Sequence, residues 1–322
     1  MISVLVTGAT TPIGERLIRS LVADTRVAHV LAVAPEPEER GLPFTHGKRL
    51  TYLQVDLTRS RRVRQLLFGP ARDLNVEVIV HLGQHRLAHD GGKKVHMQNV
   101  EALRSILDLG HRHPTIRRLV LKSFAEVYKV SLDLPVRVTE DHPLNLGGGA
   151  PQYIRDRVEA DLTACARMGL ADLEIVVLRC AEALGPGTGS QLYDYLDAPV
   201  ALRPAGYDPM VNVATIRDIV DALEKATHSS GEGVFNIPGY DTLPFSECLR
   251  KWGTTGVPLP GPLVARMYRL RHLVVGSDFS YGLNRRRLHY GLVLDGTRAR
   301  EELGYVPSNP VDWPRGGAVR NP

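Results

Sequence analysis

The 322-residue sequence has few cysteines and lacks any long apolar run. Its three cysteines, Cys165, Cys180 and Cys248, lie far apart without the paired spacing of metal ligands, which argues against a disulfide framework or a zinc site. No stretch of about 18 uncharged apolar residues exists, so we expect no transmembrane helix. The chain starts on a strand-like run instead of a basic segment followed by an apolar core, and we therefore expect a cytoplasmic protein.

A strong excess of one charge is also lacking. Forty basic residues stand against 35 acidic ones, giving a net charge of +5, and the two kinds are interspersed. This balance does not predict nucleic-acid binding, and an RNA-binding role for the basic surface would require strongly salt-dependent affinity. The 12 histidines show neither H-x-E nor H-E-x-x-H spacing, and we assign no metal site. The length predicts one large unit and a smaller lobe.

The N-terminal half alternates short β-branched runs with segments of helical period, a pattern typical of βαβ units and a parallel sheet. We expect an α/β fold with a doubly wound parallel sheet, whose ligand crevice lies beyond the carboxyl ends of the strands. The expected strands are residues 3–6, 30–33, 52–55, 76–81, 119–122 and 175–178. The expected helices are residues 14–23, 61–68, 95–110 and 153–168.

The regular alternation weakens after Arg179. The segment "GPGTG" (residues 185–189) interrupts the chain, and short elements are then separated by proline-rich stretches such as "GVPLPGP". A strand and helix over residues 211–226 and a strand over 233–239 indicate that the chain returns to the main unit. We therefore predict a main domain over residues 1–178, rejoined by about 211–238, and a small α+β lobe over 179–210 and 239–322.

An ordered series of motifs identifies a resemblance. It comprises "VTGATTPIG" (6–14), "VDLT" (55–58), "VIVHLG" (78–83), "QNVEALRSIL" (98–107), "SFAEVY" (123–128), "TEDHPL" (139–144), Tyr153-x-x-x-Arg157, "VVLRCAEALGPG" (176–187), "TIRDIVDAL" (215–223) and "LDGTRAREELGYVP" (294–307). Together these stretches resemble the extended short-chain dehydrogenase/reductases, the family of the NAD-dependent sugar epimerases and dehydratases. The resemblance covers nearly the whole chain and implies a Rossmann-like fold.

The resemblance implies that the turn after the first strand binds the pyrophosphate of NAD through backbone N–H groups and the positive end of the next helix. Gly8 and Gly14 match the outer glycines of the family's G-x-x-G-x-x-G pattern, and Thr11 stands at the middle one. A glycine there can adopt positive φ, whereas a β-branched residue is poor at positive φ and fills space beside the backbone. Pro12 removes one N–H donor, although that donor would be unpaired at a first helical position. We expect the turn to fold and its affinity for a dinucleotide to be reduced.

The end of the second strand is the next position that departs from the family. An acidic side chain there normally binds the adenosine ribose, but Ala34 occupies the position. Glu36 or Glu38 could reach back from the following loop. Together with Glu39 they disfavour NADP, whereas Arg40 keeps NADP open.

Two further family positions are retained. Asp56 lies where the family places a residue near the adenine, and Asn99 lies on the helix after the fourth strand. The candidate cofactor-binding residues are therefore Gly8, Thr11, Gly14, Asp56 and Asn99, in a weak or vestigial site.

The catalytic positions depart in the same way. In the family a serine or threonine, a tyrosine and a lysine act together: the tyrosine exchanges a proton with the substrate, and the lysine lowers the tyrosine pKa and binds the nicotinamide ribose. Tyr153 matches the tyrosine, and Arg157, one helical turn on, replaces the lysine. The family serine falls on Phe124. Ser123 is one residue off and would face the other way unless the loop changes register.

These departures fall on positions that contact cofactor or reacting atoms, while the scaffold is kept. Our leading interpretation is a pseudoenzyme that binds dinucleotide weakly or not at all and acts as a binding, regulatory or scaffold protein. The alternative is an active NAD-dependent oxidoreductase or epimerase that uses Tyr153, Arg157 and a hydroxyl such as that of Ser123. The resemblance implies nucleotide sugars or lipid-linked alcohols as its substrates.

Two basic segments allow more than one reading. "PLVARMYRLRHLVV" (262–275) is predicted to be either a helix for a membrane surface or partner, or a lid helix with a solvated basic face. "NRRRLHY" (284–290) is either an anion-binding segment or a solvated loop. The resemblance further implies a homodimer formed through the helices of residues 95–110 and 153–168. A protein partner and a nucleotide-type small molecule are the other candidate ligands.

Overall fold

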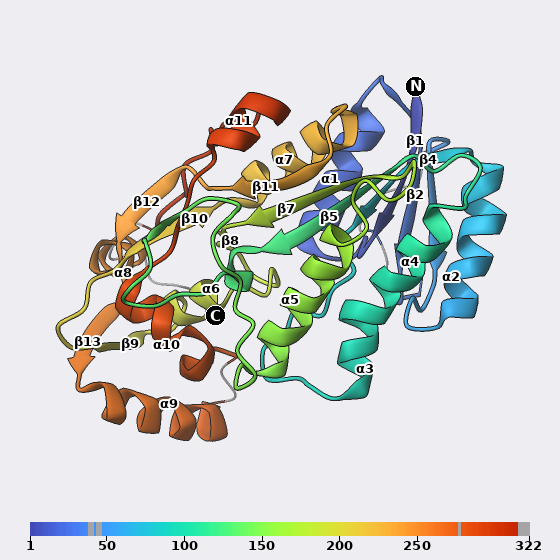
Figure 1. Ribbon diagram of the computed structural model, residues 1–322. Helices are drawn as coiled ribbons and strands as arrows, with labels where there is room; N and C mark the ends of the chain where they lie inside the picture. The colour runs from blue at the N-terminus through green and yellow to red at the C-terminus, as the bar shows by residue number, and fades with distance from the viewer. Residues whose placement is uncertain (38–41, 43–46, 276–277, 315–322) are drawn as a thin grey trace.

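A seven-stranded parallel sheet forms the centre of the molecule, with strand order β11-β7-β5-β4-β1-β2-β3 (Figure 1). The computed structural model describes residues 1–37, 42, 47–275 and 278–314. The strands of this sheet are β1 (Ile2–Thr7), β2 (Val27–Ala34), β3 (Leu50–Gln54), β4 (Val76–His81), β5 (Arg118–Phe124), β7 (Glu174–Cys180) and β11 (Gly233–Ile237). The strand order reverses at β1, as in doubly wound sheets, which confirms the predicted fold class.

Helices cover both faces of this sheet. On one face lie α1 (Pro12–Ala23) and α7 (Ile216–His228); on the other lie α2 (Ser60–Leu66), α4 (Ala102–Gly110) and α5 (Gln152–Cys165). Short π-helical turns continue α2 over Leu67–Ala71 and join α3 (Lys93–His96) to α4 over Met97–Glu101. The apolar residues of these helices recur every three to four positions and so form a stripe along each helix. This stripe packs against the buried faces of the β-branched strands and holds the helices on the sheet.

A smaller lobe lies beyond the carboxyl ends of the strands and has its own apolar cluster, which includes Tyr195, Phe245 and Tyr268. Its strands are β6 (Arg137–Val138) with β14 (Val293–Leu294), β8 (Glu182–Ala183) with β10 (Met210–Ala214) and β12 (Asp241–Pro244), and β9 (Val200–Pro204) with β13 (Thr255–Leu259). The remaining helices are α6 (Gln191–Leu196), α8 (Phe245–Trp252), α9 (Gly261–Val275), α10 (Tyr281–Tyr290) and α11 (Thr297–Leu303).

Two elements that follow the first part of the small lobe pack on the main sheet. Helix α7 packs on α1, and β11 joins the edge of the main sheet beside β7. Strand β10, however, pairs with β8 and β12 in a separate three-stranded sheet. The sequence pattern shows that a strand precedes α7 but not which sheet it joins, because both environments bury its residues.

A buried ion pair connects α5 to the centre of the sheet. The Arg179 guanidinium on β7 donates to both carboxylate oxygens of Asp161, at 3.1 and 2.7 Å. The Ser123 hydroxyl donates to the same carboxylate at 2.6 Å. Arg179 also donates to the Tyr128 hydroxyl at 3.1 Å, and that hydroxyl donates to Asn236 at 2.6 Å. The network joins β5, β7, β11 and α5, and each charge is compensated by bidentate geometry.

Another polar group lies between β1 and β4. His81 is fully buried, and its Nδ1 lies 2.8 Å from the Thr7 hydroxyl. Burial lowers the pKa of His81 to about 4, because the imidazolium form would lose its hydration. The imidazole is therefore neutral in the folded protein at neutral pH.

Replacing Asp161 by asparagine should destabilise the protein by about 3–5 kcal/mol, since the Arg179 charge would stay buried without a carboxylate. Asp108→Asn is the matched control, because Asp108 pairs with Arg167 on the surface and its loss should cost less than about 1 kcal/mol. Urea unfolding followed by circular dichroism measures both. Equal unfolding midpoints for the two variants would contradict the structural role of the buried pair.

The stability of the protein should fall as the pH is lowered from about 6.5 towards 4. The unfolded chain protonates His81 near its ordinary pKa of 6.5, whereas the folded chain does so only near 4, so the unfolded state binds more protons in that window. The contribution of His81 is complete above pH 6.5 and amounts to roughly 3 kcal/mol. Unfolding free energies at a series of pH values should depend less on pH for His81→Asn than for the unchanged chain. Parallel curves would refute this assignment.

Candidate functional site

The turn between β1 and α1 keeps its two outer glycines for steric reasons. Gly8 has φ +68°, and a Cβ on it would lie 2.7 Å from the Leu82 carbonyl oxygen. A Cβ on Gly14 would lie 2.3 Å from the Gly8 carbonyl oxygen. Thr11 has φ −77°, so the expected conflict between a β-branched residue and positive φ does not arise. The tight turn takes its positive φ at Gly8 instead.

Thr11 caps the helix that follows. Its hydroxyl accepts from the Gly14 N–H at 3.0 Å and donates to the Gly8 carbonyl at 2.8 Å. Pro12, the first helical residue, has no N–H. Two of the first three positions of α1 therefore offer no N–H to an anion, so the turn presents fewer donors to a pyrophosphate than an uncapped helix start would.

The end of β2 has no carboxylate at Ala34, which is buried and accepts the Val55 N–H. The Glu36 carboxylate reaches back to the turn, as considered from the sequence, and there accepts the Thr10 hydroxyl at 2.8 Å. Glu38, Glu39 and Arg40 lie outside the described residues. The acidic group at this edge of the crevice is thus already hydrogen-bonded within the protein.

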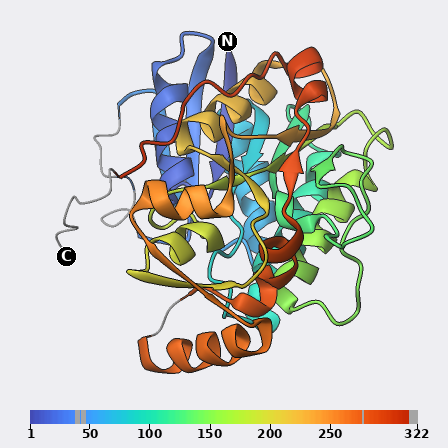
Figure 2. The same ribbon diagram turned by 90° about the vertical axis from the view of Figure 1, so that its left-hand side faces the viewer.

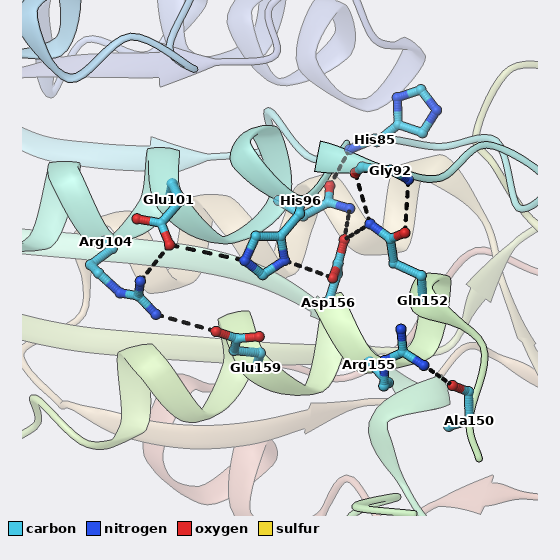
Figure 3. A network of polar contacts seen from close by, with 11 residues as sticks. His85, Gly92, His96, Glu101, Arg104, Ala150, Gln152, Arg155, Asp156 and Glu159 are labelled. Atoms are coloured by element: carbon cyan, nitrogen blue, oxygen red, sulfur yellow. Dashed lines mark hydrogen bonds and ion pairs between the residues drawn. The ribbon is translucent and has the colours of Figure 1, made fainter. Parts of the chain in front are cut away.

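Asp56 and Asn99 also have partners within the chain. Asp56 accepts from the Thr58 N–H at 3.0 Å and from the Thr58 hydroxyl at 2.6 Å, and these bonds lower the pKa of its carboxyl. Asn99 accepts the His85 N–H at 2.7 Å. Around it, Asp156 lies 2.9 Å from His96 and accepts from Gln152 at 3.2 Å, which links α3 to α5 (Figure 3). Both residues therefore take part in local hydrogen bonds of the chain.

At the catalytic positions the structure brings together Phe124, Tyr153 and Arg157. The Arg157 guanidinium carbon lies 3.5 Å from the centre of the Phe124 ring and 3.8 Å from that of the Tyr153 ring. Arg157 and Tyr153 are buried, with 3% and 5% of their surface exposed. The Lys122 ammonium also lies against Phe124, 3.6 Å from the ring centre. Two cations and two rings therefore fill the space at the end of β5.

The charge of Arg157 is balanced by carboxylates that extend into the small lobe. Glu126 lies 3.0 Å from Arg157, and Arg287 of α10 lies 2.6 Å from Glu182 and 3.9 Å from Glu126. Burial alone would raise the pKa of the Glu126 carboxyl, but Arg157 and Arg287 outweigh it and lower that pKa to about 2. Two positive and two negative groups thus alternate across the boundary between main unit and lobe.

Neither candidate hydroxyl is free. The Tyr153 hydroxyl donates to the Gly189 carbonyl at 3.3 Å, and burial raises the pKa of Tyr153 above its ordinary value. Ser123 is not brought to this cluster, because its hydroxyl donates to Asp161 at 2.6 Å. Strand β5 keeps a regular register with β7 through Phe124, so the change of register that would turn Ser123 into the crevice does not occur.

The crevice between the turn and β5 is almost filled. A cavity of about 20 Å³ remains, lined by residues that include Thr11, Lys122 and Phe124. Arg86 crosses it and donates to the Gly187 carbonyl of the "GPGTG" loop. Such a volume holds about one water molecule, so the residues present do not fit a nicotinamide dinucleotide at this place.

A larger cavity of about 670 Å³ lies beyond Tyr153, under the small lobe. Glu126, Tyr153 and three consecutive arginines of α10 contribute to its wall, and the arginines are Arg285, Arg286 and Arg287. The segment "NRRRLHY" is therefore helical and partly buried, and its arginines face both this cavity and the ion-pair cluster. A ligand with carboxylate or phosphate groups suits such a wall.

Three residues around the crevice were not predicted from the sequence: Lys122, Glu126 and Arg86. Lys122 lies two residues before Phe124 on the same strand and therefore faces the same way, a signal that strand alternation contains. Burial lowers the pKa of Lys122 to about 8, within reach of neutral pH. Arg86 and Glu126 carried no such signal, because their positions depend on loop geometry.

Among the described residues no group of three or more potential ligands could hold a metal ion.

Known proteins share this architecture and, in part, this sequence. An uncharacterized protein of Mycobacterium tuberculosis is 30% identical over 311 residues, which span 94% of this chain and 80% of that protein. The dTDP-glucose 4,6-dehydratase of Bacillus anthracis, solved with NAD, matches at a TM-score of 0.71 and 17% identity, over 97% of this chain and 94% of that one. The UDP-glucuronic acid 4-epimerase of Bacillus cereus, also solved with NAD, matches at 0.69 and 16%, over 96% and 94%.

None of the helices in the described part of the chain is long and apolar enough to cross a bilayer.

The model of the NAD dependent epimerase/dehydratase family matches residues 4–201, more than half of the sequence. That match agrees with the doubly wound sheet, the glycines of the first turn and the Tyr153-x-x-x-Arg157 helix. The chain belongs to the NAD-dependent epimerase/dehydratase family.

Proposed function

We propose that this chain is a pseudoenzyme of its family, a binding, regulatory or scaffold protein that does not use NAD. The observation that carries the proposal is the small space of about 20 Å³ left beside Phe124, together with the packing of the Arg157 guanidinium on the Phe124 and Tyr153 rings. A dinucleotide could enter only if these side chains and Arg86 moved together. Moving Arg157 would separate a buried charge from Glu126, which costs several kcal/mol.

The chemistry of Tyr153 supports the same proposal. A general acid or base works best with a pKa near the working pH, whereas burial raises that of Tyr153. The Arg157 guanidinium lies over the Tyr153 ring and pairs with Glu126, and its charge lowers the pKa of Tyr153 by less than burial raises it. Phe124 provides no hydroxyl to polarise a substrate carbonyl. The three roles that the reaction of the family distributes over three side chains are therefore not assembled.

The alternative function, an active NAD-dependent oxidoreductase or epimerase, has one observation in its favour. Tyr153 borders the cavity of about 670 Å³, which is large enough for an organic substrate, and Arg285 and Arg286 could hold anionic groups there. A nucleotide sugar or a lipid-linked alcohol is the substrate class for this alternative. It would require the crevice to open for the cofactor.

A homodimer through α4 and α5 is part of the proposal. These helices lie side by side on one face of the sheet (Figure 1), and a groove of about 440 Å³ lies against them. Leu162 on α5 and Leu146 beside it are 40% and 70% exposed, and Arg104 pairs with Glu159 at 3.2 Å across the two helices. An apolar centre with a charged rim suits a subunit interface.

We also propose that the protein is located in the cytoplasm.

Calorimetric titration with NAD or NADP should give no saturable binding to the unchanged protein. The double variant Phe124→Ser, Arg86→Ala removes the two side chains that fill and cross the crevice and should gain measurable affinity. Leu132→Ser is the control, since Leu132 is 81% exposed on another loop. Micromolar affinity of the unchanged protein for either dinucleotide would defeat the proposal.

Tyr153→Phe should leave the stability, the oligomeric state and any partner binding of the protein nearly unchanged. The lost hydroxyl makes a single long hydrogen bond, worth about 1 kcal/mol or less. In an active enzyme the same change would instead reduce turnover by a factor of about 100 or more. Thermal unfolding and assays with nucleotide sugars measure the two effects, and a large loss of turnover would establish the alternative.

A further inference from the structure

Helix α9 is the basic segment that the proposed function leaves unused. It lies at the outer edge of the small lobe, below β9 and β13, in both views (Figures 1 and 2). Val264 and Tyr268 bury one side of it in the apolar cluster of the lobe. Ala265 packs against the same cluster, and Arg271 and His272 contact Val200 and His89, so the described contacts of α9 with the protein lie on one part of its circumference.

A second apolar stripe runs along α9 beside the buried one, about a quarter of a turn away. Leu263, Met267 and Leu270 follow one another at intervals of four and three residues, which places them on one line along the helix. Their exposed fractions are 43%, 40% and 60%. A lid helix with a solvated face would be expected to carry polar residues at these positions, so the line of apolar side chains requires a partner.

Positive charges flank this stripe. Arg266 and Arg269 are exposed on one side of it, and Arg271 lies on the other side, where its guanidinium donates to the Val200 carbonyl at 2.7 Å. The sequence of α9 contains no acidic residue. An apolar line with arginines on both sides is typical of helices that lie in the plane of a membrane surface.

A cavity of about 610 Å³ opens beside α9 and extends the positive surface. Arg269, Arg285, His89 and His272 contribute to its wall, and no residue of that wall is acidic. Tyr281 also borders it; this residue is only 4% exposed, and its hydroxyl lacks a hydrogen-bond partner among the described residues. Hydrogen-bond donors and cations around an enclosed space suit a phosphate-bearing head group.

We propose that α9 and this cavity dock the protein on a bilayer that contains anionic phospholipids. Leu263, Met267 and Leu270 would enter the interfacial layer, and the arginines and the cavity would bind lipid phosphates. A second copy of the chain is a poorer partner, because a two-fold contact between α9 helices would bring like charges together. The inference is independent of the proposed pseudoenzyme role, since it uses none of the crevice residues.

Vesicle co-sedimentation of the full-length chain tests the proposal. The protein should bind phosphatidylcholine vesicles that contain phosphatidylglycerol and not pure phosphatidylcholine vesicles. Arg266→Glu with Arg269→Glu should weaken binding by about 20-fold or more, because each basic residue near an anionic surface contributes about a factor of five. Arg61→Glu with Arg62→Glu makes the same change of charge on α2 and should have little effect. Circular dichroism checks that each variant is folded.

The apolar stripe is tested separately with Leu263→Ser, Met267→Ser and Leu270→Ser combined. This variant should lose most of the binding that persists at high salt, because salt screens the arginines but not apolar insertion. Absence of binding to anionic vesicles at low salt, or full binding by the arginine variant, would overturn the proposal. A third outcome would also overturn it: the unchanged chain forms a concentration-dependent oligomer and does not bind vesicles, and the variant with three serines loses the oligomer. This result would indicate a contact between copies of the chain.

Discussion

The constraint on which this site depends is that a buried guanidinium must be neutralised. Arg157 is 3% exposed and lies between two aromatic rings, so water cannot compensate its charge. Glu126 supplies the counter-charge, and Glu126 in turn lies between Arg157 and Arg287. Arg287 reaches Glu182, whose other oxygen accepts from Ser190 at 3.1 Å. One substitution on α5 thus accounts for a chain of charges that runs into the small lobe.

This chain of charges joins the main unit to the small lobe. In an enzyme of this architecture the boundary between sheet and lobe must admit a substrate and a cofactor. Here the boundary carries alternating buried charges, the Arg86 contact with Gly187 and the Tyr153 contact with Gly189. Each contact satisfies a polar group of one part with a group of the other, so opening the boundary would leave several of them unpaired at once.

Much of the fold could be predicted from the sequence, and the reasons are local. The β-branched run from Val76 to His81 predicts a strand, and the helical period of α5 predicts a helix. The order of the motifs along the chain predicts the topology of the sheet. The conformation of Thr11 could not be predicted in the same way. A threonine at this position suggested a steric conflict with positive φ. Whether the conflict arises depends on which residue of the turn adopts positive φ, and that residue is Gly8.

The arrangement of the candidate site residues could be predicted only in part. Tyr153 and Arg157 do face one another, because residues four apart share a helical face. That the guanidinium would also lie over a second ring depended on Phe124, which comes from a strand distant in sequence. Lys122 was not predicted, although strand alternation places it on the same side of β5 as Phe124. Arg86 and Glu126 depended on loops, for which sequence periodicity gives no information.

The capped turn at Thr11 bears on how the folded state is maintained. In a protein whose helix start is completed by a bound anion, ligand binding adds to the free energy of unfolding, and the folded fraction rises and falls with ligand supply. Here a threonine hydroxyl performs that completion from within the chain. The first turn of α1 is therefore held in its helical conformation by the chain itself, before any ligand arrives.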